Sequence, residues 1–540
     1  MSDTRKAGAG AAGLILMTLC VGQFLMMLDS SVMNVSIATV ARDVGTTVTG
    51  IQTAITLYTL VMASFMITGG KIGQIIGRKR AFAIGCVIYG CGSLTTALAP
   101  NLTVLLIGWS GLEGLGAALI LPAIVALVAA NFDRAERPRA YGLVTAAAAV
   151  AVAVGPIVGG FFTTYLSWRY VFAGEVVIVI AILVLARRIA AGEPERKVKL
   201  DLVGTALSAA GLGLVVLGVL RSGTWGFVKA KPEAPEWIGL SPVVWLLLGG
   251  AAVLLLFVSW ENRLVAKERE PLVDPAILRI SVLRAGLTSF FFQYFLQGGL
   301  FFAMPLFLSI ALGLSAIETG VRLLPLSFAL ILAAAGIPKV FPDVSPRRVV
   351  RLGFLGMFAG LVVLVGALEA GAGPEIVTVP LLLAGLGMGA LASQLGSVTV
   401  SSVPDEQSGE VGGLQNTVTN LGISVGTALT GAIIIAALSS SFLTGVEENR
   451  AVPASVKARA STELSGGIPF LSDEELETAL DEARVSPRGT DAIVEENESA
   501  RLDGLRTALA VLALLALVGL LTTGRIPTRQ PGAVAEPATS

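Results

Sequence analysis

The feature that most constrains this chain is the repetition of apolar segments long enough to cross a lipid bilayer. About 20 apolar residues in a helix span the hydrocarbon core, and the 540-residue sequence holds fourteen such segments. Only 14% of its residues are charged, whereas soluble domains carry about 25%. The sequence therefore predicts an all-α membrane protein with fourteen transmembrane helices. The segments lie near residues 11–37, 50–70, 81–99, 102–129, 140–164, 170–190, 201–221, 242–261, 284–312, 318–338, 349–370, 376–400, 410–439 and 504–524.

The placement of lysine and arginine predicts the orientation of these helices. Cytoplasmic loops of membrane proteins carry an excess of basic residues. Here they gather before the first segment, in the loops after the second, fourth, sixth, eighth and tenth segments, and in the tail. Because the number of segments is even, both termini are expected in the cytoplasm. We expect a multi-pass protein of the cell (cytoplasmic) membrane.

The segments group into two halves. Similar short basic loops follow the second and the tenth segment, and repeated halves around a central binding site are common in secondary transporters. We expect one six-helix bundle at 1–190, two extra central helices at 191–281, and a second six-helix bundle at 282–527.

The region 440–503 is expected to be a long outer loop, because its composition turns polar and acidic. Within it, 453–464 and 472–485 have the character of helices, and Ser472 is a candidate cap for the second of these. A solvated helical hairpin and a role in substrate access both remain open. Residues 528–540 are expected to be a disordered cytoplasmic tail.

The first segment carries a carboxylate inside its apolar run. A charged residue at bilayer depth costs about 2.5–3.5 kcal/mol on insertion scales and marks a functional position by default. On a helix, Asp29 shares a face with Met26 and Met33, while Asn34 lies on a second polar stripe. A helix with two polar stripes cannot turn both of them to lipid. We therefore expect this helix to pack among others and to line a cavity, although Asp29 could also be a structural acceptor.

Composition excludes several kinds of chemistry. The sequence contains no histidine, which removes histidine proton relays and most catalytic zinc sites. Its three cysteines lie inside apolar runs, so no disulfide framework is expected. No phosphate-binding loop followed by Lys-Ser/Thr is present, and no metal cluster or catalytic nucleophile is visible. Basic and acidic residues balance at 38 each. We expect no enzyme, no cofactor, no metal and no nucleic-acid partner.

Glycine-bearing patterns occur at two places along the chain. The loop after the second segment reads GKIGQIIGRKR, and the fifth segment contains GPIVGG. Glycines permit tight turns and close helix approach, and a proline removes one backbone donor. Plain charge anchoring and plain helix packing are the simpler explanations. The residues concerned are Gly70, Gln74, Gly77, Arg78 and Lys79 in the loop, and Gly155, Pro156, Gly159 and Gly160 in the fifth segment.

With these motifs, and with LDSSVMNV at 28–35 and SGLEGLGAA at 110–118, the chain resembles the major facilitator superfamily, specifically its fourteen-helix drug:proton antiporter branch. The resemblance covers nearly the whole chain. It implies that the basic loop residues hold neighbouring helix ends and that GPxxGG belongs to exporting members. Gln74 stands where the family has an acid that helps latch the outward-open state, so this latch is expected to be weaker or rebuilt here.

The fourth segment departs from the family pattern. Ser110 occupies the place of a usual arginine and Glu113 that of a usual glutamine. Burial and a neighbouring like charge both disfavour an ionised carboxyl group. We hypothesise that Asp29 and Glu113 face one cavity and exchange protons near neutral pH; a hydrogen-bonded structural role for Glu113 is the alternative.

Other polar residues are candidates for the substrate cavity. Glu175 in the sixth segment could contact substrate or pair with Arg169 or Arg322, and Arg322 could reach the membrane surface instead. The second half offers polar stripes without acids, which could bind substrate or join helices. These stripes contain Gln293, Tyr294 and Gln297 in the ninth segment and Asn416 and Asn420 in the thirteenth.

The sequence thus predicts a monomeric, proton-coupled antiporter that exports amphipathic or cationic small molecules by alternating access, driven by the proton gradient. Buried acids without a buried arginine favour a cationic substrate. Export of a metabolite or lipid and proton symport by the same fold are alternatives. A non-transporting membrane sensor that uses the outer loop is an alternative of another class.

Overall fold

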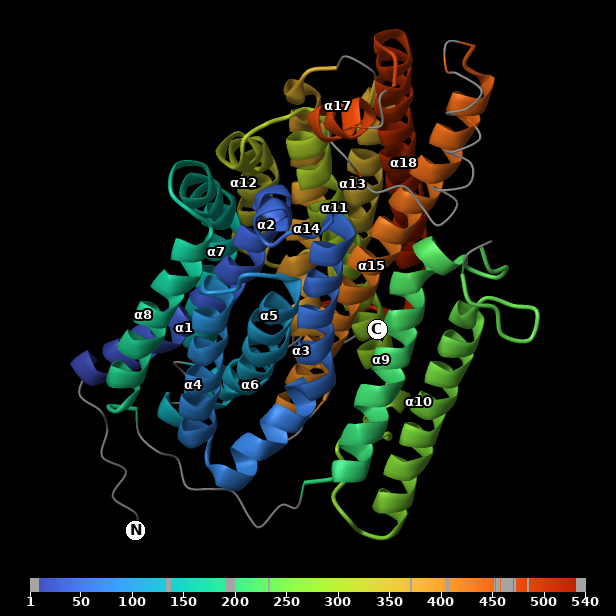
Figure 1. The fold of residues 1–540 in the computed structure, drawn as a ribbon. Coiled ribbons are helices and arrows are strands. Elements are labelled where there is room, and N and C mark those ends of the chain that lie inside the picture. The colour runs from blue at the N-terminus through green and yellow to red at the C-terminus, as the bar shows by residue number, and fades with distance from the viewer. Residues whose placement is uncertain are drawn as a thin grey trace, which may run out of the picture.

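The computed structural model describes residues 9–132, 137–189, 200–231, 234–369, 372–403, 408–450, 473–482 and 485–530, with single residues at 452, 457 and 470. The described residues are helical and contain no β-strand, only an isolated bridge between Trp237 and Leu240. Figure 1 shows a bundle of long helices that run in roughly the same direction. The all-helical prediction is confirmed.

We call α1 to α8 the first half. It comprises α1 (Ala9–Val35), α2 (Ile37–Asp43), α3 (Val48–Ile76), α4 (Arg78–Ala97), α5 (Leu102–Leu105), the π-helix η1 (Leu106–Glu113), α6 (Gly114–Asn131), α7 (Arg137–Tyr165) and α8 (Arg169–Ala186).

We call the elements from η2 onward the second half. It comprises η2 (Ile277–Arg279), α11 (Ser281–Pro305), the π-helix η3 (Leu306–Ala311), α12 (Ala316–Val340), α13 (Pro346–Ala367), η4 (Pro374–Val377), α14 (Thr378–Val400), α15 (Ser408–Glu448), α17 (Asp473–Glu482), α18 (Pro487–Thr522) and η6 (Thr523–Arg525). Between the halves stand α9 (Leu202–Trp225) and α10 (Pro242–Ala266).

Local sequence explains where several helices begin. The Thr47 hydroxyl accepts a hydrogen bond from the Gly50 amide, and the Asn101 side chain accepts one from the Val104 amide at 3.1 Å. Ser315 and Glu318 form a reciprocal capping box at the start of α12. Such caps satisfy amide groups that have no partner inside the helix.

Thirteen runs of described residues are long and apolar enough to cross a membrane. They correspond to all of the predicted segments except 81–99. That segment forms α4, a helix of 20 residues that packs against α6 and α8. Three basic residues at its start and several hydroxyl-bearing residues near its end lower its hydropathy, so the count of fourteen spans stays a prediction.

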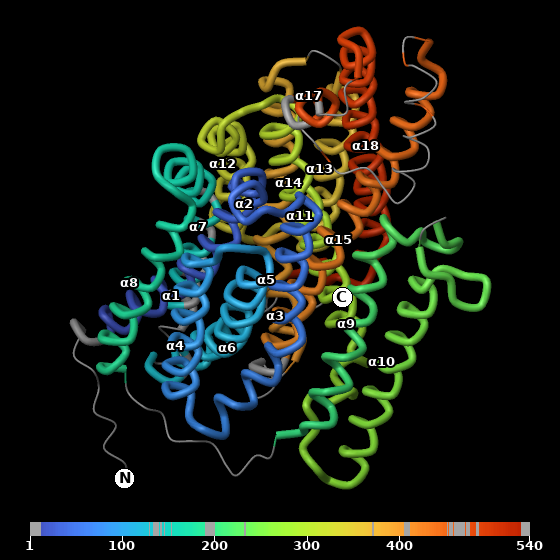
Figure 2. The backbone as a smooth tube through the Cα atoms, viewed as in Figure 1, coloured from blue at the N-terminus to red at the C-terminus, as the bar shows by residue number. Residues whose placement is uncertain are grey.

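Each half contains its own packed helix pairs, and α9 packs on α10. In the first half α1 packs on α7 and α4 on α6; in the second half α11 packs on α15, and α14 on α12 and α13. Small residues allow these contacts, since a side chain at Gly298 of α11 would lie 2.7 Å from the Ile423 carbonyl oxygen of α15. The pair α9–α10 lies beside α3 and α15 (Figure 2).

We call the end of the bundle with the α3–α4 turn the inner end, and the opposite end, which carries α2 and α17, the outer end. The described polar contacts between the two halves lie toward the outer end, while apolar contact extends further in, where Ile67 of α3 packs against a cluster that contains Val411 and Leu414 of α15. Gln52 of α3 donates to the carbonyl oxygens of Thr427 and Ala428 of α15, both at 3.1 Å, and the Ile317 amide of α12 donates to the Thr164 hydroxyl of α7 at 3.1 Å.

The predicted outer loop is partly wrong in its bounds. Helix α15 continues to Glu448 and α18 begins at Pro487, so both helices extend beyond the predicted segments 410–439 and 504–524. Polar composition ends a membrane span but does not end a helix, and proline suits the first position of α18. Helix α17 confirms the predicted helix at 472–485, whereas Ser472 and the segment 453–464, apart from Lys457, lie outside the described residues.

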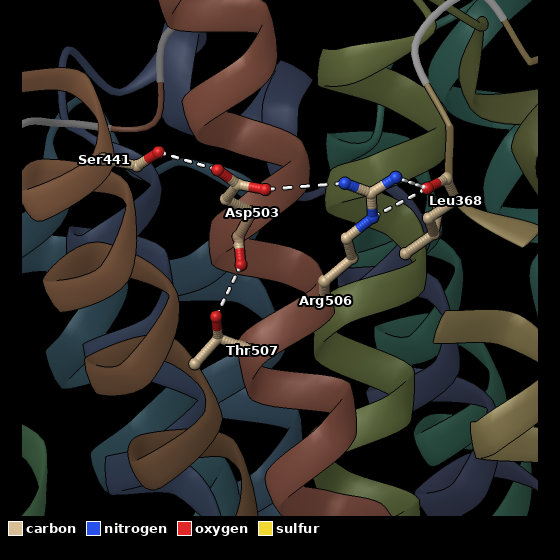
Figure 3. A network of polar contacts seen from close by, with 5 residues as sticks. All are labelled: Leu368, Ser441, Asp503, Arg506 and Thr507. Atoms are coloured by element: carbon tan, nitrogen blue, oxygen red, sulfur yellow. Dashed lines mark hydrogen bonds and ion pairs between the residues drawn. The ribbon is translucent and has the colours of Figure 1, made fainter. Parts of the chain in front are cut away.

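Polar contacts fix the outer part of α18 to its neighbours (Figure 3). Asp503 accepts a hydrogen bond from Ser441 of α15 at 2.7 Å and lies 3.5 Å from the Arg506 guanidinium. Arg506 donates through Nε to the Leu368 carbonyl oxygen at the end of α13, at 2.8 Å. One turn of α18 thus joins α15 to α13.

The predicted tail is ordered at its beginning. The Gln530 amide donates to the Val344 carbonyl oxygen at 2.9 Å and to Gln394 at 3.0 Å, and Arg347 donates through Nε to the Ile526 carbonyl oxygen at 2.6 Å. The described chain thus continues three residues into the predicted tail, and Gln530 contacts the α12–α13 turn and α14. Residues 531–540 lie outside the described part of the chain.

Candidate functional site

Three carboxyl groups meet inside the first half. Asp29 comes from α1, Glu113 from the end of η1 and Glu175 from α8, and one oxygen of each lies within 4.8 Å of the others. Their side chains are 0%, 0% and 1% exposed. We call these residues the acid cluster. The predicted neighbours Asp29 and Glu113 are thus adjacent, and Glu175 joins them.

Asp29 is held by an indole group. Trp109 Nε1 donates to both Asp29 oxygens, at 2.9 and 3.0 Å. The Trp109 ring stacks on Tyr58 of α3 with centroids 4.9 Å apart and planes 7° apart. The Tyr58 hydroxyl is next to the Asp29 carboxyl group but makes no hydrogen bond of good geometry. A neutral donor therefore orients Asp29 from one side.

Glu113 owes its position to a π-helical turn and a glycine. Residues 106–113 form η1, and such turns occur frequently at functional sites. The Thr96 hydroxyl of α4 donates to Glu113 Oε1 at 2.9 Å. A β-carbon at Gly92 of α4 would lie 2.6 Å from Glu113 Cγ, so only glycine leaves room for the side chain.

Glu175 pairs with hydroxyl groups and with no arginine. Ser93 and Tyr89 of α4 both donate to its Oε2, at 3.1 and 3.3 Å. The predicted pairing with Arg169 is wrong, because Arg169 binds Asp43 at 2.9 Å and the Ala99 carbonyl oxygen at 3.0 Å at the outer end. Arg322 lies on α12 of the second half and lines a shallow outer groove with Glu318.

Every donor that contacts the acid cluster in the described residues is neutral: an indole, a tyrosine and two aliphatic hydroxyl groups. Ser110, at the place of the expected arginine, donates instead to the Ala54 carbonyl oxygen of α3 at 2.8 Å. Glu113 Oε2 and Glu175 Oε1 are buried without a hydrogen-bond partner. Buried charges are costly unless they are paired, so this cluster needs protons or a cation to neutralise it.

The other residues predicted for the first-half cavity lie elsewhere on α1. Met26 and Met33 are buried in the hydrophobic core. Asn34 is half-buried and donates to the Ser30 carbonyl oxygen of its own helix at 2.7 Å.

The second-half candidates lie on α11 and α15, and in the described residues none of them forms a hydrogen bond with the acid cluster. Gln293 is 2% exposed with an unpartnered Oε1, while Tyr294 stacks on Phe290 and Gln297 is half-buried. Asn420 donates to the Asn416 carbonyl oxygen at 2.9 Å. The structure thus separates the carboxyl groups of the first half from the amides of the second.

The loop motif forms the inner turn between α3 and α4. Gly77 has a φ of +97°, a conformation that favours glycine. Lys79 donates to the carbonyl oxygens of Arg187 and Ile189, at 2.9 and 2.6 Å, where α8 ends, and Arg78 donates to the Ala126 carbonyl oxygen of α6 at 3.2 Å. Gly70 faces Pro122 of α6. Gln74 is half-buried on α3.

The GPxxGG motif of α7 lies between α1 and the second half. Gly155 faces Ser31 and Gly159 faces Val32, both on α1. A β-carbon at Gly160 would lie 2.6 Å from the Ala316 carbonyl oxygen of α12, and Gly320 of α12 packs on Pro156. The motif therefore lets α7 approach two helices closely on different sides.

Sequence reasoning missed the neutral partners of the acid cluster. Tyr89, Ser93 and Thr96 are spaced by four and three residues on one face of α4, and Trp109 stands four residues before Glu113. These spacings place side chains on one helix face. They could have marked the partners, but the pairing of α4 with α8 and η1 was needed to use them.

Two packed halves of long apolar helices, with ionisable groups enclosed inside one half, define a multi-pass membrane transporter. The sequence model of the Major Facilitator Superfamily matches residues 19–427, and the chain belongs to this family. Its members are transporters, so the chain is not an enzyme, as predicted.

Several relatives are export or resistance proteins, and a riboflavin transporter, RibZ of Clostridioides difficile, is also similar. The chain is 30% identical over 437 residues to the cephamycin export protein CmcT of Amycolatopsis lactamdurans, covering 79% of this chain and 85% of the relative. It is 27% identical over 524 residues to multidrug resistance protein Stp of Mycobacterium tuberculosis, covering 94% and 90%. Among solved structures, a bacterial homologue of the human lysosomal transporter Spinster matches with a TM-score of 0.61 and 14% identity, covering 96% of this chain and 98% of that one.

Proposed function

We propose that this protein exports amphipathic or cationic small molecules in exchange for protons by alternating access. The observation that carries the proposal is the acid cluster, in which three enclosed carboxyl groups meet only neutral donors. Three negative charges this close repel one another, so the cluster takes up protons when it is buried and releases them when water reaches it. Export as the direction is supported by the similarity to export and resistance proteins.

A continuous series of contacts joins the cluster to the interface between the halves. Asp29 lies two residues before Ser31, which packs under Gly155 of α7. Pro156 and Gly160, on the same helix, pack on Gly320 and Ala316 of α12. A change in the charge on Asp29 that moves α1 would therefore act on the α7–α12 contact. This series of neighbouring contacts supports a coupling between the charge on Asp29 and the contact between the two halves.

The contacts between the halves support a conformation closed at the outer end. The described polar contacts between them involve Gln52, Thr56, Thr164 and their partners, all toward that end. In the proposed cycle this closed state opens to the inside and receives substrate there. Release follows when the outer contacts separate.

The same proposal includes the topology. We place fourteen spans in the cell membrane, α4 among them, with both termini in the cytoplasm and a monomer as the working unit. The basic inner loop with Arg78 and Lys79 supports this orientation.

The test is transport by the full-length protein in proteoliposomes, with a substrate panel and an imposed pH gradient. Wild type is expected to move a cationic or amphipathic member of the panel against its gradient, in step with proton movement. Asp29→Asn and Glu113→Gln are expected to abolish proton-driven transport. Glu261→Gln is the matched control, because Glu261 is also 0% exposed but lies on α10, away from the cluster.

Three results would overturn the proposal. Unchanged proton-driven transport in both cluster variants would remove the coupling role. Substrate movement in the same direction as protons would indicate symport, and the absence of any flux across a broad panel would favour a sensor.

A further inference from the structure

The acid cluster contains buried oxygen atoms that have no hydrogen-bond partner. Glu113 Oε2, Glu175 Oε1 and the Tyr58 hydroxyl oxygen are all buried without a hydrogen-bond partner. Their side chains belong to residues that are at most 1% exposed. Unsatisfied buried polar atoms are rare in folded proteins and call for a specific explanation.

These atoms belong to neighbouring side chains that come from different helices. Tyr58 comes from α3, Glu113 from η1 and Glu175 from α8, and Asp29 of α1 completes the group. The three carboxyl groups each place one oxygen within 4.8 Å of the other two. Tyr58 is a separate observation because it is not one of the acids. Its ring stacks on Trp109, and its hydroxyl lies next to Asp29.

This geometry suits a small metal cation. Hard cations such as Ca²⁺ take oxygen ligands at about 2.3–2.6 Å, so two oxygens on one ion lie at most about 5 Å apart. Carboxylate and hydroxyl oxygens are ligands of this hard type, and no sulfur or nitrogen ligand is among them. A cation would contact oxygens of all three acids at once, whereas a proton satisfies one donor–acceptor pair.

The charge of the site points the same way. The partners of the cluster are the neutral groups of Trp109, Thr96, Ser93 and Tyr89. In the described part of the chain, no lysine or arginine is among the groups that act on the three carboxyl groups. A metal cation therefore has no positive competitor in the site, and it supplies the compensation that a buried carboxylate group needs.

We propose that Asp29, Glu113, Glu175 and the Tyr58 hydroxyl form a binding site for one hard, oxygen-preferring metal cation. The site uses the same residues as the proposed function but does not depend on proton coupling. The ionisable groups that face it are Asp29 on α1, Tyr58 on α3, Tyr89 on α4, Glu113 on η1 and Glu175 on α8.

The experiment uses the purified full-length protein in lipid nanodiscs, freed of metals and kept in choline buffer at pH 8. NaCl, CaCl₂, MgCl₂ and KCl are added one at a time at ionic strength matched with choline chloride. Binding is followed by the rise in Tm, because a ligand that binds only the folded state stabilises it, and by titration calorimetry. We expect saturable binding of Na⁺ or Ca²⁺.

The variants separate a metal site from a merely structural cluster. Glu175→Gln and Tyr58→Phe each remove one ligand oxygen or its charge, and each is expected to weaken binding by about tenfold or more. Tyr58→Phe keeps the stacked ring and serves where Glu175→Gln fails to fold. Glu261→Gln, a buried glutamate on α10, is expected to bind as wild type does.

Two outcomes would overturn the inference: no cation binds, or binding is the same in Tyr58→Phe and Glu175→Gln as in wild type. Proton-driven transport is measured separately in metal-free choline buffer. Transport without cation binding leaves the proposed function intact, whereas cation binding without transport leaves this inference intact.

Discussion

The contact of Gln52 with α15 allows a quantitative test of the closed outer end. Gln52 is 2% exposed, and its amide donates two hydrogen bonds of 3.1 Å to carbonyl oxygens of the other half. A net contribution of about 0.5–1.5 kcal/mol for each bond gives about 1–3 kcal/mol. In Gln52→Ala the closed conformation should therefore lose about 5- to 150-fold in population relative to the open one.

The assay is the distance between spin labels at Thr47 and Ala436, two exposed positions toward the outer ends of α3 and α15. The labels are placed in a background in which Cys20, Cys86 and Cys91 are replaced by alanine. Wild type should give mainly a short distance, and Gln52→Ala should add a longer one.

Two further variants sharpen the reasoning. Thr53→Ala is the control, because the Thr53 hydroxyl donates at 2.8 Å to Thr49 of its own helix. Gly431→Ala should open the outer end as Gln52→Ala does, since a β-carbon there would collide with the Gln52 amide. In the double variant Gln52→Ala/Gly431→Ala the second change should add little, because its partner is gone. Identical distance distributions in wild type and Gln52→Ala would refute the argument.

Three other predictions concern packing and the outer elements. Gly160→Val should abolish transport without loss of membrane insertion, because its side chain would enter the α12 backbone 2.6 Å from the Ile317 Cα atom; transport at wild-type protein level would contradict this. Asp473→Asn removes the 2.6 Å ion pair with buried Arg501. The free energy of local opening of α17 should fall by about 1–2 kcal/mol, a value kept small because Asp473 is 43% exposed, and hydrogen exchange in α17 should become faster. Unchanged exchange would show that the pair does not hold α17. Arg506→Met should lower thermal stability by about 1–2 kcal/mol through lost bonds to the Leu368 carbonyl oxygen, whereas Arg525→Met at the exposed inner end should not.

Apolar segment length predicted the helices well because a bilayer imposes the same requirement on every span. The predicted segment 170–190 became α8 at Arg169–Ala186, and 242–261 became α10 at Pro242–Ala266. The same signal failed at α15 and α18, which continue as helices into polar sequence. Hydropathy reports the edge of the membrane, while helix ends depend on caps, glycine and proline.

The candidate site was predicted only in part. Asp29 and Glu113 stood out because each is a carboxyl group in an apolar run. For Glu175 the sequence left a substrate contact and a pairing with Arg169 or Arg322 open, since charge attraction was the only guide before the helix order in space was known. Tyr58 and Trp109 carry no such signal, because a buried aromatic residue is ordinary in a membrane helix. Their role depends on stacking between α3 and η1.

The placement of α9 beside α3 and α15 makes the two sides of the transporter unequal toward the lipid. Leu212 and Val216 of α9 pack with Leu60 of α3 and Leu421 of α15, so α9 covers the line where the halves meet. On the opposite side, α7 and α12 pack on each other, and neither α9 nor α10 lies beside them (Figure 1). The extra pair therefore covers the contact between α3 and α15 but not the contact between α7 and α12. A movement of one half against the other, as the proposed cycle requires, would slide α3 or α15 along α9 and leave the α7–α12 side without such a contact.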